Sequence, residues 1–196
     1  WASQLLFAGI RFTLAGVLII VFISLKNRSF LFPQKKSWGM ISKLSIFQTI
    51  LQYLCFYIGL GHTTGVKSSI IVGSNVFVAI VISAIFFRLE HLSWNKIIGC
   101  IIGFIGIVII NVTGNSIDFH MSLTGEGMIF GSTIAYAISS VLIKSYSKHE
   151  NPVVLSAYQF IIGGIVLMLT GILAGGHMSI PNMNGIGIIL YLALIS

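Results

Sequence analysis

Long apolar stretches separated by short polar connections dominate the chain. They cover residues 4–25, 44–61, 68–87, 94–112, 126–143 and 153–174, and a further one begins near Gly185. A helix needs about 20 residues to cross the hydrocarbon core of a bilayer, and these stretches approach or reach that length. Open strands would leave backbone groups unpaired in lipid, and barrel strands would show short segments of alternating polarity. The pattern therefore predicts an all-α, polytopic membrane helix bundle.

Composition supports this fold class and excludes several others. Hydrophobic residues make up 56% of the 196 residues and charged residues only 8%, whereas soluble domains carry about 25% charged residues. A cytosolic enzyme, a disordered tail and a disulfide-stapled secreted module are excluded. Cys55 and Cys100 lie in apolar stretches without zinc-type spacing. The net charge is +7, but the chain lacks the polar, soluble surface that a nucleic-acid-binding protein needs. We therefore expect a lipid bilayer as partner and no nucleic acid.

The basic residues predict an orientation in the membrane. One set of connections carries nine Lys and Arg residues and comprises 26–43, 88–96 and 144–152. The alternate set carries only Lys67 and comprises 62–67, 113–125 and 175–184. Because Lys and Arg accumulate on the cytoplasmic side, the first set is expected to be cytoplasmic. We therefore expect a multi-pass protein of the cell (inner) membrane.

An internal repeat relates two of the helices. At an offset of 148 residues, 8–18 falls on 156–166, so that Phe12 meets Phe160 and Gly16 meets Gly164. The loop charges predict opposite directions for these two helices, which is typical of the inverted repeats of transporters. We predict a first repeat over 1–113, with its helices two to five, and a second over 124–196, with its helices one to three and then truncated. The intact protein would have about ten helices.

Several motifs carry a family resemblance. Those in the first repeat are Phe56-Tyr57-Ile58-Gly59-Leu60, His62-Thr63-Thr64-Gly65, Phe87-Arg88-Leu89-Glu90-His91-Leu92 and Trp94…Gly99…Gly103…Gly106. Those in the second are Ala135-Tyr136-Ala137, Asn151-Pro152 and Tyr158-Gln159-Phe160. In order and spacing they resemble the two EamA domains of the drug/metabolite transporter superfamily. The resemblance implies two inverted five-helix halves around a central cavity, and transport of small metabolites, often amino acids or related solutes, across the bacterial inner membrane.

Polar residues inside the apolar stretches are candidates for solute binding. A mid-membrane Arg normally faces a cavity or a partner, so Arg11 is expected to face an anion, with snorkelling or a structural tie as the alternative. At the repeat offset Arg11 meets Gln159, which places both beside one solute site between the repeats. The full candidate set, which shares helix faces by spacing of three or four, is Arg11, Gln48, Gln52, Tyr53, Asn75, Ser132, Tyr136, Tyr158 and Gln159.

The candidate residues also have structural interpretations. Interhelical hydrogen bonding is the alternative for Gln48 and Gln52. Asn75 stands where the EamA family often has Pro, so it is expected to bind solute, to form a hinge or to bond a neighbouring helix. Glu126 lies near a helix start, where the helix dipole stabilises a carboxylate; proton coupling is the alternative.

Glycine spacing offers a separate structural prediction. Gly99…Gly103 and Gly127…Gly131 have the spacing that lets two helices pack closely. We therefore expect these glycines at helix–helix contacts. Spacing alone does not support a homodimer, so the oligomeric state is left open.

The function that the sequence predicts is secondary transport. We expect a small metabolite, amino acid-like or related, to cross the membrane by alternating access. An enzyme would need His, Asp or Glu residues converging at bilayer depth, and the sequence shows none, nor a nucleotide-binding glycine loop. We therefore expect no enzyme activity, no cofactor and no metal. The alternatives are a nucleotide-sugar or phosphate-ester carrier of the same superfamily and a non-transporting integral membrane subunit.

Overall fold

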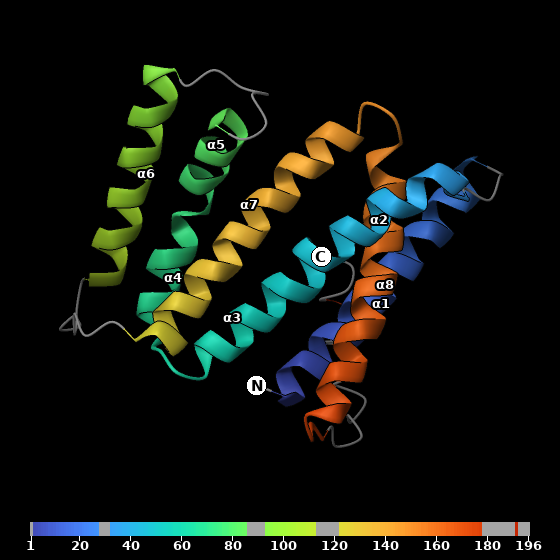
Figure 1. The fold of residues 1–196 in the computed structure, drawn as a ribbon, viewed down its shortest axis with the longest axis horizontal. Coiled ribbons are helices and arrows are strands. Elements are labelled where there is room, and N and C mark those ends of the chain that lie inside the picture. Colours follow the sequence, from blue (N-terminus) through green and yellow to red (C-terminus); the bar gives the residue numbers. More distant parts are fainter. Residues whose placement is uncertain (1, 28–31, 86–92, 113–121, 178–190, 192–196) are drawn as a thin grey trace. The chain divides into compact units, whose positions relative to one another are not determined.

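The regular elements of the chain are helices. The computed structural model describes residues 2–27, 32–85, 93–112, 122–177 and 191 (Figure 1). The elements in chain order are α1 (Ala2–Asn27), η1 (Lys35–Ser37), α2 (Trp38–Leu44), η2 (Ser45–Leu51), α3 (Gln52–Leu60), α4 (Gly65–Gly73), α5 (Asn75–Ile85), α6 (Trp94–Val112), η3 (Leu123–Gly127), α7 (Met128–Tyr146) and α8 (Pro152–Leu173). Of these, η1 is a 3₁₀ turn, and η2 and η3 are π-helical.

Length and composition make this a multi-pass membrane protein. Five described stretches are long and apolar enough to cross a bilayer: Ala2–Lys26, Lys35–Leu60, Gly65–Ala84, Leu123–Tyr146 and Pro152–Leu173. The prediction of an all-α membrane bundle is confirmed. The expected stretch from Gly185 lies outside the described residues except for Tyr191.

Two helices differ from their expected course. The second begins at Lys35 rather than near residue 44, because its first turns carry the lysines that look like a loop in the sequence. The third is interrupted at Ser74, which ends α4 before Asn75 begins α5. The Ser74 hydroxyl donates to the Ile71 carbonyl at 2.6 Å, so a side chain takes up a carbonyl where the helix ends.

Local capping fixes where two of the helices begin. Thr64 precedes α4, and its hydroxyl accepts the Lys67 N–H at 3.4 Å. Asn151 precedes α8 and accepts the Val153 N–H at 3.0 Å, and Pro152 follows at the first helical position. Proline has no N–H to leave unpaired and its φ suits a helix, so Asn-Pro is a strong start signal.

The chain divides into two compact units. Unit 1 comprises Trp1–Ile50 and Leu142–Ser196, and unit 2 comprises Leu51–Val141. Unit 1 therefore contains α1, η1, α2 and α8, and unit 2 contains α3 to α6 with η3. The divisions fall within η2 and within α7.

Helices α1 and α8 pack side by side along their lengths in unit 1 (Figure 1). A Cβ added at Gly171 would meet the Leu6 backbone at 2.7 Å, whereas one added at Gly16 would meet the Ala157 carbonyl at 2.6 Å. The early residues of α1 thus lie against the late residues of α8, so the two helices are antiparallel. This is the relation that the inverted-repeat prediction requires.

The contacts of α1 and α8 are also reciprocal. The ring of Phe12 stacks on that of its repeat equivalent, Phe160, with centroids 5.4 Å apart. A Cβ at Gly16 would strike the carbonyl of residue 157 and the side chain of residue 161. One at the equivalent Gly164 would strike the carbonyl of residue 9 and the side chain of residue 13. Because 9 and 13 are the equivalents of 157 and 161, a local two-fold axis passes between the two phenylalanine rings.

A second contact in unit 1 holds α2 against α8. Ile41, Leu44 and Leu155 are almost fully buried, with exposures of at most 1%. Partly buried side chains of α2, α7 and α8 surround them, namely Met40, Leu142, Ile143, Tyr146, Tyr158 and Ile162. This cluster places η2, the continuation of α2, directly against the middle of α8.

Unit 2 is built on α3, α4, η3 and α6. Helix α3 contacts η3, and α4 contacts both η3 and α6. The predicted close packing at Gly99, Gly103 and Gly131 is wrong for the described residues, because a Cβ added at any of them would meet nothing within 4 Å. Close approach occurs instead at Gly59, where a Cβ would lie 2.8 Å from the Gly125 carbonyl.

Candidate functional site

Two of the predicted site residues are directly bonded in unit 1. The Gln159 Nε2 donates to the Gln48 Oε1 at 2.9 Å. Gln159 is fully buried, and its backbone carbonyl accepts a 3.3 Å bond from the Ser45 hydroxyl. The π-helical η2 thus meets α8 through a polar contact, although both segments are mostly apolar. We call the contact formed by Ser45, Gln48, Thr49 and Gln159 the amide seam.

Part of the amide seam has unused hydrogen-bonding capacity. The Gln159 Oε1 and the Thr49 Oγ1 are buried and have no hydrogen-bond partner among the described residues. Thr49 is 1% exposed and lies against α8 at Gly163, where an added Cβ would be 2.4 Å from the Thr49 Cβ. An unpaired polar atom away from water is costly, so these two atoms are suited to a polar group that enters the seam.

Arg11 lies beside the α1–α8 contact. Its guanidinium carbon is 4.7 Å from the centroid of the Phe12 ring, the ring that stacks on Phe160. The Arg11 Nε is buried and bonds no described residue. A guanidinium over an aromatic face gains a cation–π attraction, but its N–H groups still need an acceptor.

Tyr158 lies in an aromatic cluster rather than in the amide seam. Its ring is 6.0 Å from that of Trp38, edge to face, and 6.0 Å from that of Phe32. Aromatic pairs of this geometry stabilise a packed core. The structural interpretation of Tyr158 is therefore better supported than solute binding.

The other predicted site residues lie in unit 2, and the structure does not join them into one site. The Ser132 hydroxyl donates to the Ile129 carbonyl of its own helix at 2.6 Å. The Tyr53 ring packs 6.0 Å from that of Tyr57. Tyr136 is 37% exposed. The Gln52 Oε1 and the Asn75 Oδ1 are buried and accept no hydrogen bond from the described residues.

Asn75 begins α5 directly after the helix break at Ser74. Three uses were expected of it, namely solute binding, a hinge and a bond to a neighbouring helix. Its place at the break favours the hinge. The polar residue thus coincides with a local change of helix course, as a Pro would produce.

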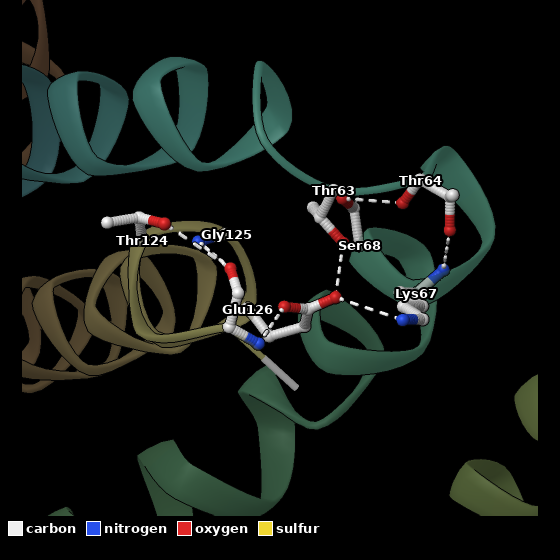
Figure 2. A network of polar contacts seen from close by, with 8 residues as sticks. Thr63, Thr64, Lys67, Ser68, Thr124, Gly125 and Glu126 are labelled. Carbon is white, nitrogen blue, oxygen red and sulfur yellow. Dashed lines mark hydrogen bonds and ion pairs between the residues drawn. The ribbon is translucent and has the colours of Figure 1, made fainter. Parts of the chain in front are cut away.

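Glu126 is at the centre of a polar network in unit 2 (Figure 2). Its carboxylate accepts the Thr63 hydroxyl at 2.7 Å and lies 3.4 Å from the Lys67 Nζ. The other oxygen accepts the Ser122 N–H at 2.8 Å, and the Ser122 hydroxyl accepts the Gly125 N–H at 2.9 Å. This is a reciprocal cap at the start of η3, which supports the helix-start interpretation of Glu126 over proton coupling.

Sequence reasoning missed two features of these sites. Thr49 follows Gln48 directly, but Thr is common in membrane helices, so its hydroxyl gives no distinct signal in the sequence. Thr63 meets Glu126 across 63 residues of sequence, and no local pattern announces such a contact. The Ser122…Glu126 spacing at the beginning of an apolar stretch signals the local cap but not the contact with Thr63.

The EamA-like transporter family matches the chain over residues 2–112 and 123–196. The chain belongs to this family, and the resemblance stated on its motifs is confirmed. The repeat boundaries at 113 and 124 stay a prediction.

The relatives carry transporter names. An uncharacterized transporter of Archaeoglobus fulgidus is 30% identical over 84% of this chain and 56% of its own length. The uncharacterized transporter YvbV of Bacillus subtilis is 30% identical over 87% of this chain and 54% of its own. The chloroplastic WAT1-related protein At3g02690 of Arabidopsis thaliana is 22% identical over 85% and 40%. The chain spans about half the length of these relatives. No solved structure matches it.

Proposed function

We propose that the chain is part of a secondary transporter that moves a small polar metabolite, amino acid-like or related, by alternating access. The amide seam carries this proposal. A glutamine pair between two apolar helices, with Gln159 fully buried and two unused polar atoms in the seam, suits a solute that offers both hydrogen-bond donors and acceptors. Solute sites of inverted-repeat transporters lie near the bilayer midplane at the repeat interface.

Arg11 supports a solute that also carries a negative charge. The repeat offset makes Arg11 the equivalent of Gln159, and each precedes one member of the Phe12–Phe160 stack. A guanidinium whose buried Nε has no hydrogen-bond partner among the described residues suits a carboxylate. An amino acid-like solute would thus meet a charged group on one side of the two-fold axis and amides on the other.

The basic connections support a location in the cytoplasmic membrane with 26–43, 88–96 and 144–152 inside. In this orientation α1 runs from the outside to the inside and α8 in the reverse direction. The turn between α3 and α4 and the start of α7 then lie at the outer face.

The experiment is a solute uptake panel with the full-length protein in proteoliposomes. It includes amino acids, neutral polar metabolites and phosphate esters, and it compares the wild type with Arg11→Ala, Arg11→Lys and Gln159→Ala. Gln4→Ala is the matched control, because Gln4 is an exposed polar residue of α1. Loss of a charge-assisted hydrogen bond of about 1.5–3 kcal/mol predicts roughly 10- to 100-fold weaker uptake of the anionic solute by Arg11→Ala. Arg11→Lys should recover part of it.

Each outcome decides between the proposals. Unchanged uptake in both alanine variants refutes the assignment of Arg11 and Gln159 to the solute site. Preference for phosphate esters over amino acids favours the carrier alternative of the same superfamily. Uptake no faster than in empty liposomes for every solute favours a non-transporting membrane subunit.

A further inference from the structure

The Glu126 network joins the two family segments to each other. Glu126 belongs to the second matched segment, whereas Thr63 and Lys67 belong to the first. The Glu126 side chain is 5% exposed and that of Lys67 is 18% exposed. We call the contact between Thr63, Lys67, Ser122 and Glu126 the clasp.

The backbones beneath the clasp are in direct contact. A Cβ added at Gly59 would lie 2.8 Å from the Gly125 carbonyl oxygen, and one added at Gly125 would lie 2.8 Å from the His62 carbonyl oxygen. Because Gly59 and Gly125 carry no side chain, the backbones at the end of α3 and in η3 approach closely. Such close backbone contact adds packing between the two segments.

Separation of the clasp would be unfavourable for a second reason. It would remove the ammonium and the hydroxyl from a carboxylate that is almost fully buried. A buried charge left without its partner is far less stable than the formed pair. The compact unit 2 likewise includes α3 to α6 together with the first part of α7, so its limits do not follow the sequence repeats.

We propose that the clasp is a fixed joint that stays closed throughout the transport cycle. The inference rests on the proposed function. The α3–α4 turn and the start of α7 then move as one body, although they belong to different repeats. The moving bodies of this transporter are therefore not the two sequence repeats themselves, which differs from simple rocking of one half against the other.

A covalent bridge across the clasp tests this proposal. The full-length protein would carry Thr63→Cys and Glu126→Cys, with Cys55, Cys100 and any cysteine elsewhere in the full-length protein replaced by serine. A short bifunctional thiol reagent joins the new cysteines, and reducing agent releases it. The fixed joint predicts that bridging changes solute exchange in proteoliposomes less than twofold. Loss of exchange on bridging, with recovery on reduction, overturns the proposal and makes the clasp a gate.

A second measurement applies even when no solute is transported. Hydrogen exchange of the wild type should show protected amides at Ser122 and Gly125, because both donate in the clasp. Glu126→Gln, which keeps the side-chain shape, should raise exchange in 59–67 and 122–129 together and lower the Tm by about 3 °C or more. Wild-type exchange in these segments as fast as in the exposed turn 147–149 overturns the fixed joint. Absence of transport with this protection intact refutes the proposed function alone.

Discussion

Replacement of Gly163 by alanine tests the packing that holds the amide seam together. Gly163 lies one turn after Gln159 on α8 and faces Thr49 of η2. The new methyl group would be centred 2.4 Å from the Thr49 Cβ and 2.6 Å from its Cγ2. The Cγ2 can turn about the Cα–Cβ bond, but the Cβ is fixed to the backbone and cannot move away by rotation. The helix and the π-helical segment must therefore move apart.

The structure gives the size of this effect. Ordinary van der Waals contact begins at 3.4 Å, so the two segments must separate by about 1 Å. Overpacking of this kind costs about 1–3 kcal/mol. The same movement would stretch the 2.9 Å bond between Gln159 and Gln48 beyond hydrogen-bonding distance, with a further loss of about 1 kcal/mol. We expect Gly163→Ala to lose roughly 2–4 kcal/mol of unfolding free energy.

The assay is equilibrium unfolding of the full-length protein in mixed micelles, followed by tryptophan fluorescence. Gly103→Ala is the matched control, because Gly103 is also helical and an added Cβ there meets no described atom within 4 Å. Both variants gain the same helix propensity, about 1 kcal/mol. The difference between their unfolding free energies therefore isolates the collision with Thr49.

A compensating change sharpens the result. Thr49→Gly removes the atoms that the new methyl group would strike, so Gly163→Ala should cost much less in that background than in the wild type. Such non-additivity is expected only for residues in contact. Equal stability of Gly163→Ala and Gly103→Ala, or simple additivity with Thr49→Gly, would refute the close approach of α8 and η2.

Two further predictions concern unit 1. Gly16→Ala and Gly164→Ala should each lower the free energy of unfolding by about 1–3 kcal/mol, because each new methyl group meets a backbone carbonyl of the opposite helix. Thermal unfolding of both variants measures this loss. A neutral result for one variant alone contradicts the local two-fold axis. Asn151→Ala should lower stability by about 1 kcal/mol through loss of the α8 cap. The control Ser147→Ala, at an exposed position, should change stability by less than about 0.5 kcal/mol. Equal Tm values for the two variants would contradict the capping role of Asn151.

The packing of α1 on α8 could be predicted in part from the sequence. The offset that aligns Phe12 with Phe160 and Gly16 with Gly164 also gives the register in which the two helices meet. Residues on a two-fold axis face their own equivalents, so a repeat fixes which residues oppose each other once two equivalent helices are in contact. Whether they are in contact depends on all the helices together, and the sequence does not show it.

Glycine roles could not be predicted, because spacing does not reveal what lies opposite. Gly99 and Gly103 have the favoured four-residue spacing, yet an added Cβ there meets nothing in the described part of the chain. Gly59 and Gly125 have no such spacing and are the ones in direct backbone contact. A small residue allows a close approach but does not create the second surface.

The apolar stretches predicted the beginning of α8 but not that of the second membrane helix. Asn151-Pro152 precedes the apolar stretch in the sequence, and α8 begins at Pro152 in the structure. The lysines at 35 and 36 indicated a loop, but they form the first turn of the second helix. Basic residues are favourable in the part of a membrane helix that reaches the headgroups, so an apolar boundary underestimates the helix.

The local two-fold axis duplicates packing but not chemistry. Phenylalanine meets phenylalanine and glycine meets a carbonyl on both sides, so the shape of the α1–α8 contact is the same from either helix. The polar residues beside the axis differ, since Gln159 has an amide partner in Gln48 whereas Arg11 presents a charge with a buried Nε. A symmetric frame can present similar geometry to both sides of a membrane, as inverted repeats require. In the proposed transporter, this asymmetric pair of polar groups would hold a solute with two unlike ends in one orientation.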